Sequence, residues 1–204
     1  MTDGNATTNP GAAPDASGTA RGRFVVLDGV DGCGKTTQAT MLAERLAAER
    51  GGVTPLHLRE PGSTAIGERI RAVLLDRDFD NVRPDVETLL FCAARAQTLA
   101  ELVRPALLAG RDVVCERLHA STFAYQAVAG ELGEQRVLGL LETWAGEPEP
   151  DLTLILDIDV VDAAERRGEP RDRIEAKGIE FQRRVAEGYR RYAELVWQEV
   201  QRVL

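Results

Sequence analysis

The sequence predicts an α/β fold in three layers, with a parallel β-sheet covered by helices on both faces. Short apolar segments alternate along the chain with segments whose apolar residues recur at helical spacing. The short segments are apolar at nearly every position, which is typical of strands buried on both faces of a parallel sheet. A glycine-rich turn, residues 29–36, joins the first of these strands to the first helix.

The first half of the chain contains two strand–helix pairs. Strands are expected over residues 23–28 and 53–58, which are short and apolar. Helices are expected over residues 35–50 and 64–75, because each carries apolar residues at helical spacing. These residues are Ala39, Leu42, Ala43 and Leu46 in the first helix, and Ile66, Ile70, Val73 and Leu74 in the second.

A longer helix is expected over residues 85–103, interrupted or restarted by Pro105 and ended by Gly110. Its apolar stripe is predicted to face the core. The residues of this stripe are Val86, Leu89, Leu90, Ala93 and Ala96. Further strands are expected over residues 112–116 and 152–157, and the last helical pattern runs from about Gly178 to the C-terminus.

Composition indicates one soluble domain over residues 23–204, preceded by a disordered tail over residues 1–22. The net charge of −8, from 25 basic and 33 acidic residues, argues against a protein that mainly grips nucleic acid. No apolar run reaches the roughly 18 residues of a membrane span. Three cysteines without a Cys-x-x-Cys pair fit a reducing cytoplasm, and two histidines exclude a His-rich metal site.

Residues 29–36 (GVDGCGKT) match the phosphate-binding pattern G-x-x-x-x-G-K-[ST]. Its glycines let successive N–H groups point at phosphate oxygens, and the following helix adds its positive end. Lys35 reaches the outer phosphates and the Thr36 hydroxyl ligates Mg²⁺. The motif therefore predicts a P-loop NTPase-type fold and a Mg²⁺·nucleoside triphosphate site. The expected nucleotide-binding residues are Gly29, Val30, Asp31, Gly32, Cys33, Gly34, Lys35, Thr36 and Thr37.

The loop alone leaves open a phosphoryl transferase or a nucleotide-hydrolysing switch. A guanine-reading Asn-Lys-x-Asp element is missing, because beyond the tail only Asn81 is an asparagine, and Val82 follows it. Four arginines lie within eight residues of the C-terminal third: Arg166, Arg167, Arg171 and Arg173. Such cations suit a lid, residues 165–174, that closes over two phosphorylated substrates.

Five segments together resemble the thymidylate kinase family, whose members phosphorylate dTMP with ATP. They are GVDGCGKTTQ at 29–38, REPGST at 59–64, LLF at 89–91 with Arg95, the ER…S…AYQ pattern of 116–126, and DRIE at 172–175. They follow family order over some 170 residues, from Arg23 to about Tyr192. The resemblance implies a dTMP kinase that works with Mg²⁺ as a homodimer.

The resemblance also implies the acceptor site. Phe91 would stack on the thymine ring, and Arg95 would donate a hydrogen bond to a thymine carbonyl. Cytosine presents an amino donor at that edge, which would repel Arg95. Asp31 would accept a hydrogen bond from the sugar 3′-hydroxyl. Tyr125 would crowd the 2′ position and so disfavour ribose. The remaining implied dTMP contacts are Arg59 and Arg117 for the phosphate, and Ser121 and Gln126 for the base. The implied catalytic residues are Lys35, Glu116, Arg117, Arg167 and Arg171, with Thr36 and Glu116 near the metal.

Three features depart from the family pattern. Glu116 stands where Asp is usual, so its longer side chain rearranges any metal contact, and Asp28 stands where Glu is usual. The family's closing strand and short helix are expected to be missing, so that either the chain supplies four strands or the sequence is truncated. A kinase for another nucleoside monophosphate or a deoxynucleoside, and a nucleotide-binding switch or assembly protein without transfer, remain the alternatives.

Overall fold

The computed structural model describes residues 21–79, 81–170 and 172–203, with side chains described as far as residue 196. The expected tail therefore lies, for residues 1–20, outside the described part of the chain. Its last two residues contact the body: Arg21 pairs with Asp151 at 2.8 Å, and Gly22 donates a backbone hydrogen bond to Leu107 at 2.9 Å. The folded body thus includes residues just before Arg23.

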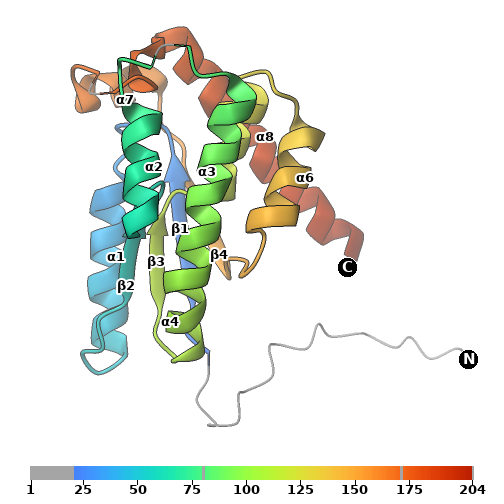
Figure 1. The fold of residues 1–204 in the computed structure, drawn as a ribbon. Helices are drawn as coiled ribbons and strands as arrows, with labels where there is room; N and C mark the ends of the chain where they lie inside the picture. Colours follow the sequence, from blue (N-terminus) through green and yellow to red (C-terminus); the bar gives the residue numbers. More distant parts are fainter. Residues whose placement is uncertain (1–20, 80, 171, 204) are drawn as a thin grey trace, which may run out of the picture.

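In the described part of the chain, four parallel strands form the sheet, as the sequence predicts (Figure 1). They are β1 (Phe24–Gly29), β2 (Leu56–Arg59), β3 (Val113–Glu116) and β4 (Leu152–Leu156), in the spatial order β2-β3-β1-β4. In register, Phe24 lies opposite Val113 and Val25 opposite Leu152. The start of β2 was expected at Val53 but lies at Leu56, because Pro55 has no amide hydrogen for the ladder.

Helical segments connect and cover the strands. The longer ones are α1 (Lys35–Glu49), α2 (Ala65–Leu75), α3 (Pro84–Thr98), α6 (Glu134–Ala145), α7 (Val160–Arg167) and α8 (Ile179–Val203). The shorter ones are the π-helical turns η1 (Leu99–Val103) and η2 (Phe123–Val128), the helices α4 (Arg104–Leu108) and α5 (His119–Thr122), and the 3₁₀ turn η3 (Glu175–Lys177). The predicted interruption at Pro105 is confirmed as a π-helical turn followed by α4.

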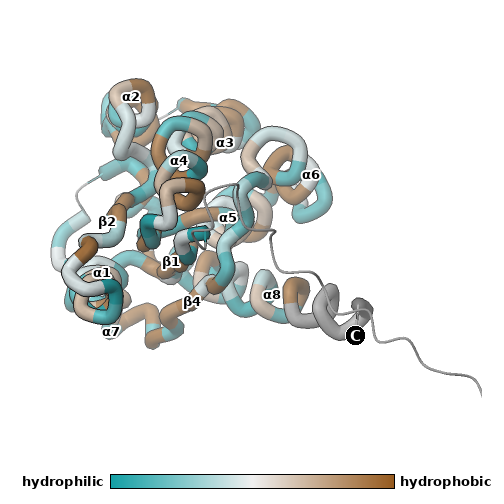
Figure 2. Tube along the Cα trace, turned by 90° about the horizontal axis from the view of Figure 1, so that it is seen from below, coloured by the Kyte–Doolittle hydropathy of each residue, from teal (hydrophilic) through white to brown (hydrophobic). Residues whose placement is uncertain are grey.

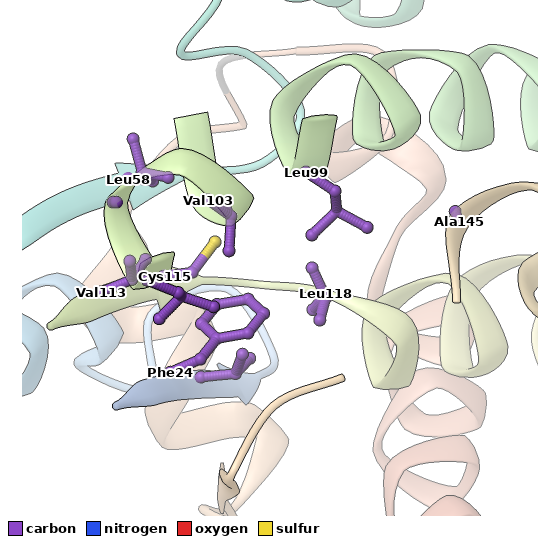
Figure 3. Close-up of a cluster of buried hydrophobic side chains, with 11 residues drawn as sticks. Phe24, Leu58, Leu99, Val103, Val113, Cys115, Leu118 and Ala145 are labelled. Carbon is purple, nitrogen blue, oxygen red and sulfur yellow. The ribbon is translucent and has the colours of Figure 1, made fainter. Parts of the chain in front are cut away.

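The two faces of the sheet bury different side chains, because neighbouring strand residues point to opposite sides. Leu27 and Val114 pack against α1 through Ala39 and Leu46. Phe24 and residues of β2 and β3 pack on the other face against η1 and α4. The labelled members of that cluster are Phe24, Leu58, Leu99, Val103, Val113, Cys115, Leu118 and Ala145 (Figure 3). Figure 2 shows α1 and α4 on opposite sides of the strands, which completes the three layers.

The predicted inward stripe of α3 is wrong. Val86 and Leu89 are 43% and 52% exposed, whereas the side chains that α3 buries include Glu87, Thr88 and Arg95. On α2, Ile66 and Val73 of the predicted stripe are likewise exposed, although Leu74 is buried. Helical spacing identifies an apolar stripe but not the surface that covers it. We call the exposed side chains of Ile66, Val73, Val86 and Leu89 the α2–α3 patch.

Candidate active site

The site lies at the carboxyl ends of the strands, where parallel sheets form their ligand crevices. The phosphate loop runs between β1 and α1. Its glycines are required by close contacts: a Cβ on Gly32, whose φ is 91°, would lie 2.0 Å from the Ala163 carbonyl oxygen of α7. A Cβ on Gly29 would lie 2.6 Å from the Leu156 carbonyl oxygen. The loop therefore packs directly against the end of β4 and the helix that leads into the arginine-rich segment.

Lys35 lies at the mouth of this loop. Its buried ammonium group donates hydrogen bonds to the carbonyl oxygens of Gly29, at 3.0 Å, and Val30, at 2.8 Å. Burial, followed by the positive charge of Arg117, lowers the pKa of Lys35 below its ordinary value. The loop thus holds a cation at the position from which the sequence expects it to reach the outer phosphates.

The two predicted metal-site residues meet beside the loop. Thr36 Oγ1 donates to Glu116 Oε2 at 2.5 Å, and the second carboxylate oxygen lies 3.0 Å from His57 Nε2. A hydroxyl and a carboxylate are hard oxygen ligands of the kind Mg²⁺ takes together with substrate phosphates. This pair fits a magnesium ion, although no group of three or more His, Cys, Asp and Glu side chains that could hold a metal occurs among the described residues.

Arg117 follows β3 in a left-handed backbone conformation, with φ of 70°. Its guanidinium forms an ion pair with Asp31 of the phosphate loop and donates to Ser121 Oγ at 3.0 Å and to Tyr189 Oη at 3.1 Å. Burial acts to raise the pKa of Asp31, but the charges of Arg117 and then Lys35 outweigh it and hold that pKa below its ordinary value. The loop carboxylate is therefore ionised and joined to Arg117.

Asp28, near the end of β1, holds the two hydroxyl groups to which Arg117 donates. Its Oδ1 accepts hydrogen bonds from Ser121 Oγ at 2.5 Å and from Tyr189 Oη at 2.9 Å, and Oδ2 accepts from the Leu118 amide at 2.9 Å. Ser121 is thus hydrogen-bonded to Asp28 and Arg117. Tyr189, from α8, is a part of the site that the sequence analysis did not identify.

A cavity of about 120 Å³ opens beside the phosphate loop. It brings together most residues of the predicted acceptor site: Asp31, Phe91, Arg95, Arg117, Ser121, Tyr125 and Gln126. Tyr125 Oη donates to Asp31 Oδ2 at 3.0 Å. Arg59 is not among the lining residues: its side chain is 54% exposed and lies 3.6 Å from Glu68.

Other lining residues were not predicted. They are Glu60, Pro61, Arg71, Leu75, Thr122, Asp172, Ile174 and Glu175. Arg71 donates to the Pro61 carbonyl at 2.9 Å, and burial, then the charge of Arg59, lowers its pKa. No pattern marks Arg71, which occupies an ordinary position of α2. Glu60 and the segment from Asp172 belong to motifs already singled out, so their position in those motifs is a signal that could have found them.

Arg95 and Glu60 form a buried ion pair in the pocket wall, with 2.6 Å between Nε and Oε2 and only 2% of each side chain exposed. Burial raises the pKa of Glu60, although the charge of Arg95 acts to lower it. Burial acts to lower the pKa of Arg95, but the charge of Glu60 and its hydrogen bond raise that pKa above its ordinary value. Within the described part of the chain, Arg95 Nη1 and Glu60 Oε1 are buried without a hydrogen-bond partner. The pair therefore leaves one donor and one acceptor that no described residue satisfies.

The predicted lid starts from α7, which ends at Arg167. Arg167 Nε is buried and has no hydrogen-bond partner among the described residues. Arg171 lies outside the described residues. Arg173 is engaged in structural contacts, donating to the Leu74 carbonyl at 2.9 Å and to Glu87 at 2.6 Å.

Comparisons with known proteins agree on one family. The family model described as thymidylate kinase matches residues 27–203. A thymidylate kinase from Caldanaerobacter subterraneus is 42% identical over 172 residues, which cover 84% of this chain and 81% of that protein. One from Synechococcus sp. is 45% identical over 181 residues, covering 85% of each. The crystal structure of thymidylate kinase from Ehrlichia chaffeensis superposes with a TM-score of 0.70 at 29% identity, covering 85% of this chain and 82% of that one.

Proposed function

The chain belongs to the thymidylate kinase family, and on that premise we propose that it transfers the γ-phosphoryl group of ATP to dTMP with the residues of the loop and pocket described above. One observation carries this proposal. Asp31 belongs to the phosphate loop and also lines the acceptor cavity, where Arg117 pairs with it. A donor bound to the loop and an acceptor in the cavity would therefore meet at this pair.

On the donor side, the loop amides, Lys35 and Thr36 hold the ATP phosphates. Magnesium, held by Thr36 and by Glu116 directly or through water, would neutralise charge on the transferring phosphoryl group. The 2.5 Å contact between Thr36 and Glu116 supports this assignment, because the carboxylate of the longer Glu116 side chain lies beside the Thr36 hydroxyl.

On the acceptor side, the thymine ring packs on Phe91. The free Arg95 Nη1 donor suits the thymine O4, and the neighbouring Glu60 acceptor suits N3–H. Cytosine presents an amino donor and an unprotonated nitrogen at these positions and is rejected. The carboxylate of Asp31 and the hydroxyl of Tyr125 face the sugar, and Arg117 binds the monophosphate, for which it exchanges part of its contact with Asp31.

The lid, residues 165–174, closes over the phosphates. Phosphoryl transfer needs cationic stabilisation beyond Lys35 and Mg²⁺, and the phosphate loop has no arginine. The buried Arg167 Nε, which no described residue satisfies, makes Arg167 the first candidate, with Arg171 as the second. The lid belongs to the catalytic domain expected over residues 23–204, to which the contacts of Arg21 and Gly22 add the two preceding residues.

The kinase acts as a cytoplasmic homodimer. The α2–α3 patch supports the dimer, because two helices that contact each other expose four large apolar side chains. No helix in the described residues is long and apolar enough to cross a membrane.

A coupled assay of ATP consumption with dTMP, dUMP, UMP, CMP, AMP and GMP tests the proposed substrate. We expect dTMP to give the highest kcat/KM. CMP should be lower by at least about a hundredfold, since a hydrogen-bonding pocket rejects mismatched groups strongly. UMP should also be lower, because its 2′-hydroxyl meets Tyr125. A preference for another monophosphate would indicate a different nucleotide kinase, and ATP consumption without an acceptor would indicate a hydrolase.

A further inference from the structure

Glu87 is a buried carboxylate of α3 that the reaction as described above does not use. Its side chain is 5% exposed. Oε2 accepts a hydrogen bond from Arg173 at 2.6 Å, and Oε1 accepts one from Gln126 at 3.0 Å and lies 3.5 Å from Lys177 Nζ. One carboxylate thus joins α3, the π-helical turn η2 and the segment that begins at the end of the lid.

That segment, residues 172–177, is here called the strap. It is fixed to α2 as well, because Arg173 donates to the Leu74 carbonyl and its amide donates to the Leu75 carbonyl at 3.3 Å. Asp172 Oδ1 accepts hydrogen bonds from the Ile174 and Glu175 amides, both at 2.9 Å, which turns the backbone at the start of the strap.

The strap forms one wall of the acceptor cavity. Asp172, Ile174 and Glu175 line it, and so does Gln126, the η2 residue that Glu87 holds. Ion pairs at 2.6 and 3.5 Å on a side chain this deeply buried are strong, because little water screens them. The two walls contributed by η2 and the strap therefore take their positions from the same carboxylate.

We propose that Glu87 is a positioning residue for dTMP binding: it holds the strap and Gln126 against the acceptor cavity and thereby ties the end of the lid to the occupied pocket. This inference rests on the proposed function. It assigns Glu87 no contact with the reacting atoms. Its loss should weaken dTMP binding and loosen the lid end, while the ATP site around Lys35 keeps its affinity.

The test compares Glu87→Gln with the wild type and with Asp85→Asn, a matched control two residues away on α3 whose carboxylate pairs with Arg83 at the surface. Calorimetry gives the Kd of dTMP, steady-state kinetics give KM for dTMP and ATP, and trypsin digestion reports cleavage after the lid and strap cations. For Glu87→Gln we expect the Kd and KM of dTMP to rise about tenfold or more, as for a lost charge-assisted hydrogen bond. The KM of ATP should change by less than about threefold.

In the wild type, dTMP should slow trypsin cleavage within residues 165–177, and in Glu87→Gln this protection should be lost. Arg173→Gln should reproduce the weaker dTMP binding, and the double variant should be no weaker than Glu87→Gln, because both changes remove the same ion pair. Where Glu87→Gln does not fold, Lys177→Gln, which alters a partly exposed partner, should raise the dTMP Kd about threefold.

Unchanged dTMP affinity in the folded variants, or equal increases in the KM of dTMP and ATP, would overturn the role of Glu87. A wild-type protein that neither binds nor phosphorylates dTMP would instead refute the proposed function, so the two failures are distinguishable.

Discussion

The buried pair of Glu60 and Arg95 provides the sharpest test of the pocket wall. Changing Glu60 to Gln keeps the shape of the side chain but removes its charge. It leaves the Arg95 guanidinium, which is 2% exposed, without a counter-ion. Removing one partner of a buried ion pair costs about 3–5 kcal/mol of the free energy of unfolding. For a domain of this size, each kcal/mol lowers Tm by about 2–4 °C, so Tm should fall by about 6–20 °C.

Urea denaturation followed by circular dichroism measures this loss, with differential scanning fluorimetry for Tm. Glu68→Gln is the matched control, because it removes an acidic partner of Arg59 at the surface, where the expected cost is under about 1 kcal/mol. The double variant Glu60→Gln, Arg95→Met removes both members, and it should be more stable than Glu60→Gln alone. A double variant at least as unstable as Glu60→Gln would refute the reasoning that an unpaired buried charge causes the loss.

The remaining predictions concern catalysis and pH. Lys35→Ala should lower kcat on the order of 10³-fold, since it removes charge that stabilises the transition state. Wild-type turnover in this variant would contradict the catalytic role of Lys35. Arg167→Ala should lower kcat far more than it changes KM; a wild-type kcat in the Arg167→Ala, Arg171→Ala double variant would exclude the lid as the source of the cation. A 3′-deoxy analogue of dTMP should bind but show a clearly lower kcat/KM, because the half-buried Asp31 carboxylate loses a partner. Burial lowers the pKa of His119 from 6.5 to about 4, so the unfolded chain binds more protons between these values; the free energy of unfolding should therefore fall as pH drops from 6.5 toward 4, and His119→Gln should reduce this dependence in pH-dependent urea denaturation.

The sequence predicted best what depends on neighbouring residues. The strand–turn–helix around the phosphate loop follows from the apolar run at 23–28, the glycines and Lys35, and the structure forms it with the expected boundaries to within a residue. The acceptor residues were implied by the family resemblance, and the structure brings most of them together in one cavity. The meeting of strand ends at one edge of a parallel sheet accounts for Arg117, which follows β3. Arg59 is the exception: it is the last residue of β2, but its exposed side chain lies near Glu68 and does not line the cavity.

Pairings between distant residues could not be predicted from local patterns. Glu60 and Arg95 are 35 residues apart, and Glu87 and Arg173 are 86 apart, so nothing in their own segments identifies the partner. Both pairs join a loop or strap to α3. Their contribution depends on burial, which the fold decides, because the same ion pairs at the surface would contribute little.

The inverted face of α3 connects these observations. A helix that packs only on a core buries its apolar side, but α3 buries Glu87 and Arg95 and exposes Val86 and Leu89. Charged residues at buried helix positions cost free energy unless they are paired. Arg95 is paired with Glu60 in the wall of the cavity, and Glu87 is paired with Arg173 of the strap. Such an arrangement is explained when the polar side faces a ligand pocket and the apolar side faces a second subunit. The polarity of α3 therefore supports both the dTMP pocket and the proposed dimer. Substituting Leu89 with Asp should convert the proposed dimer to a monomer in sedimentation analysis. A wild-type chain that sediments as a monomer would refute the dimer and leave the pocket assignment standing.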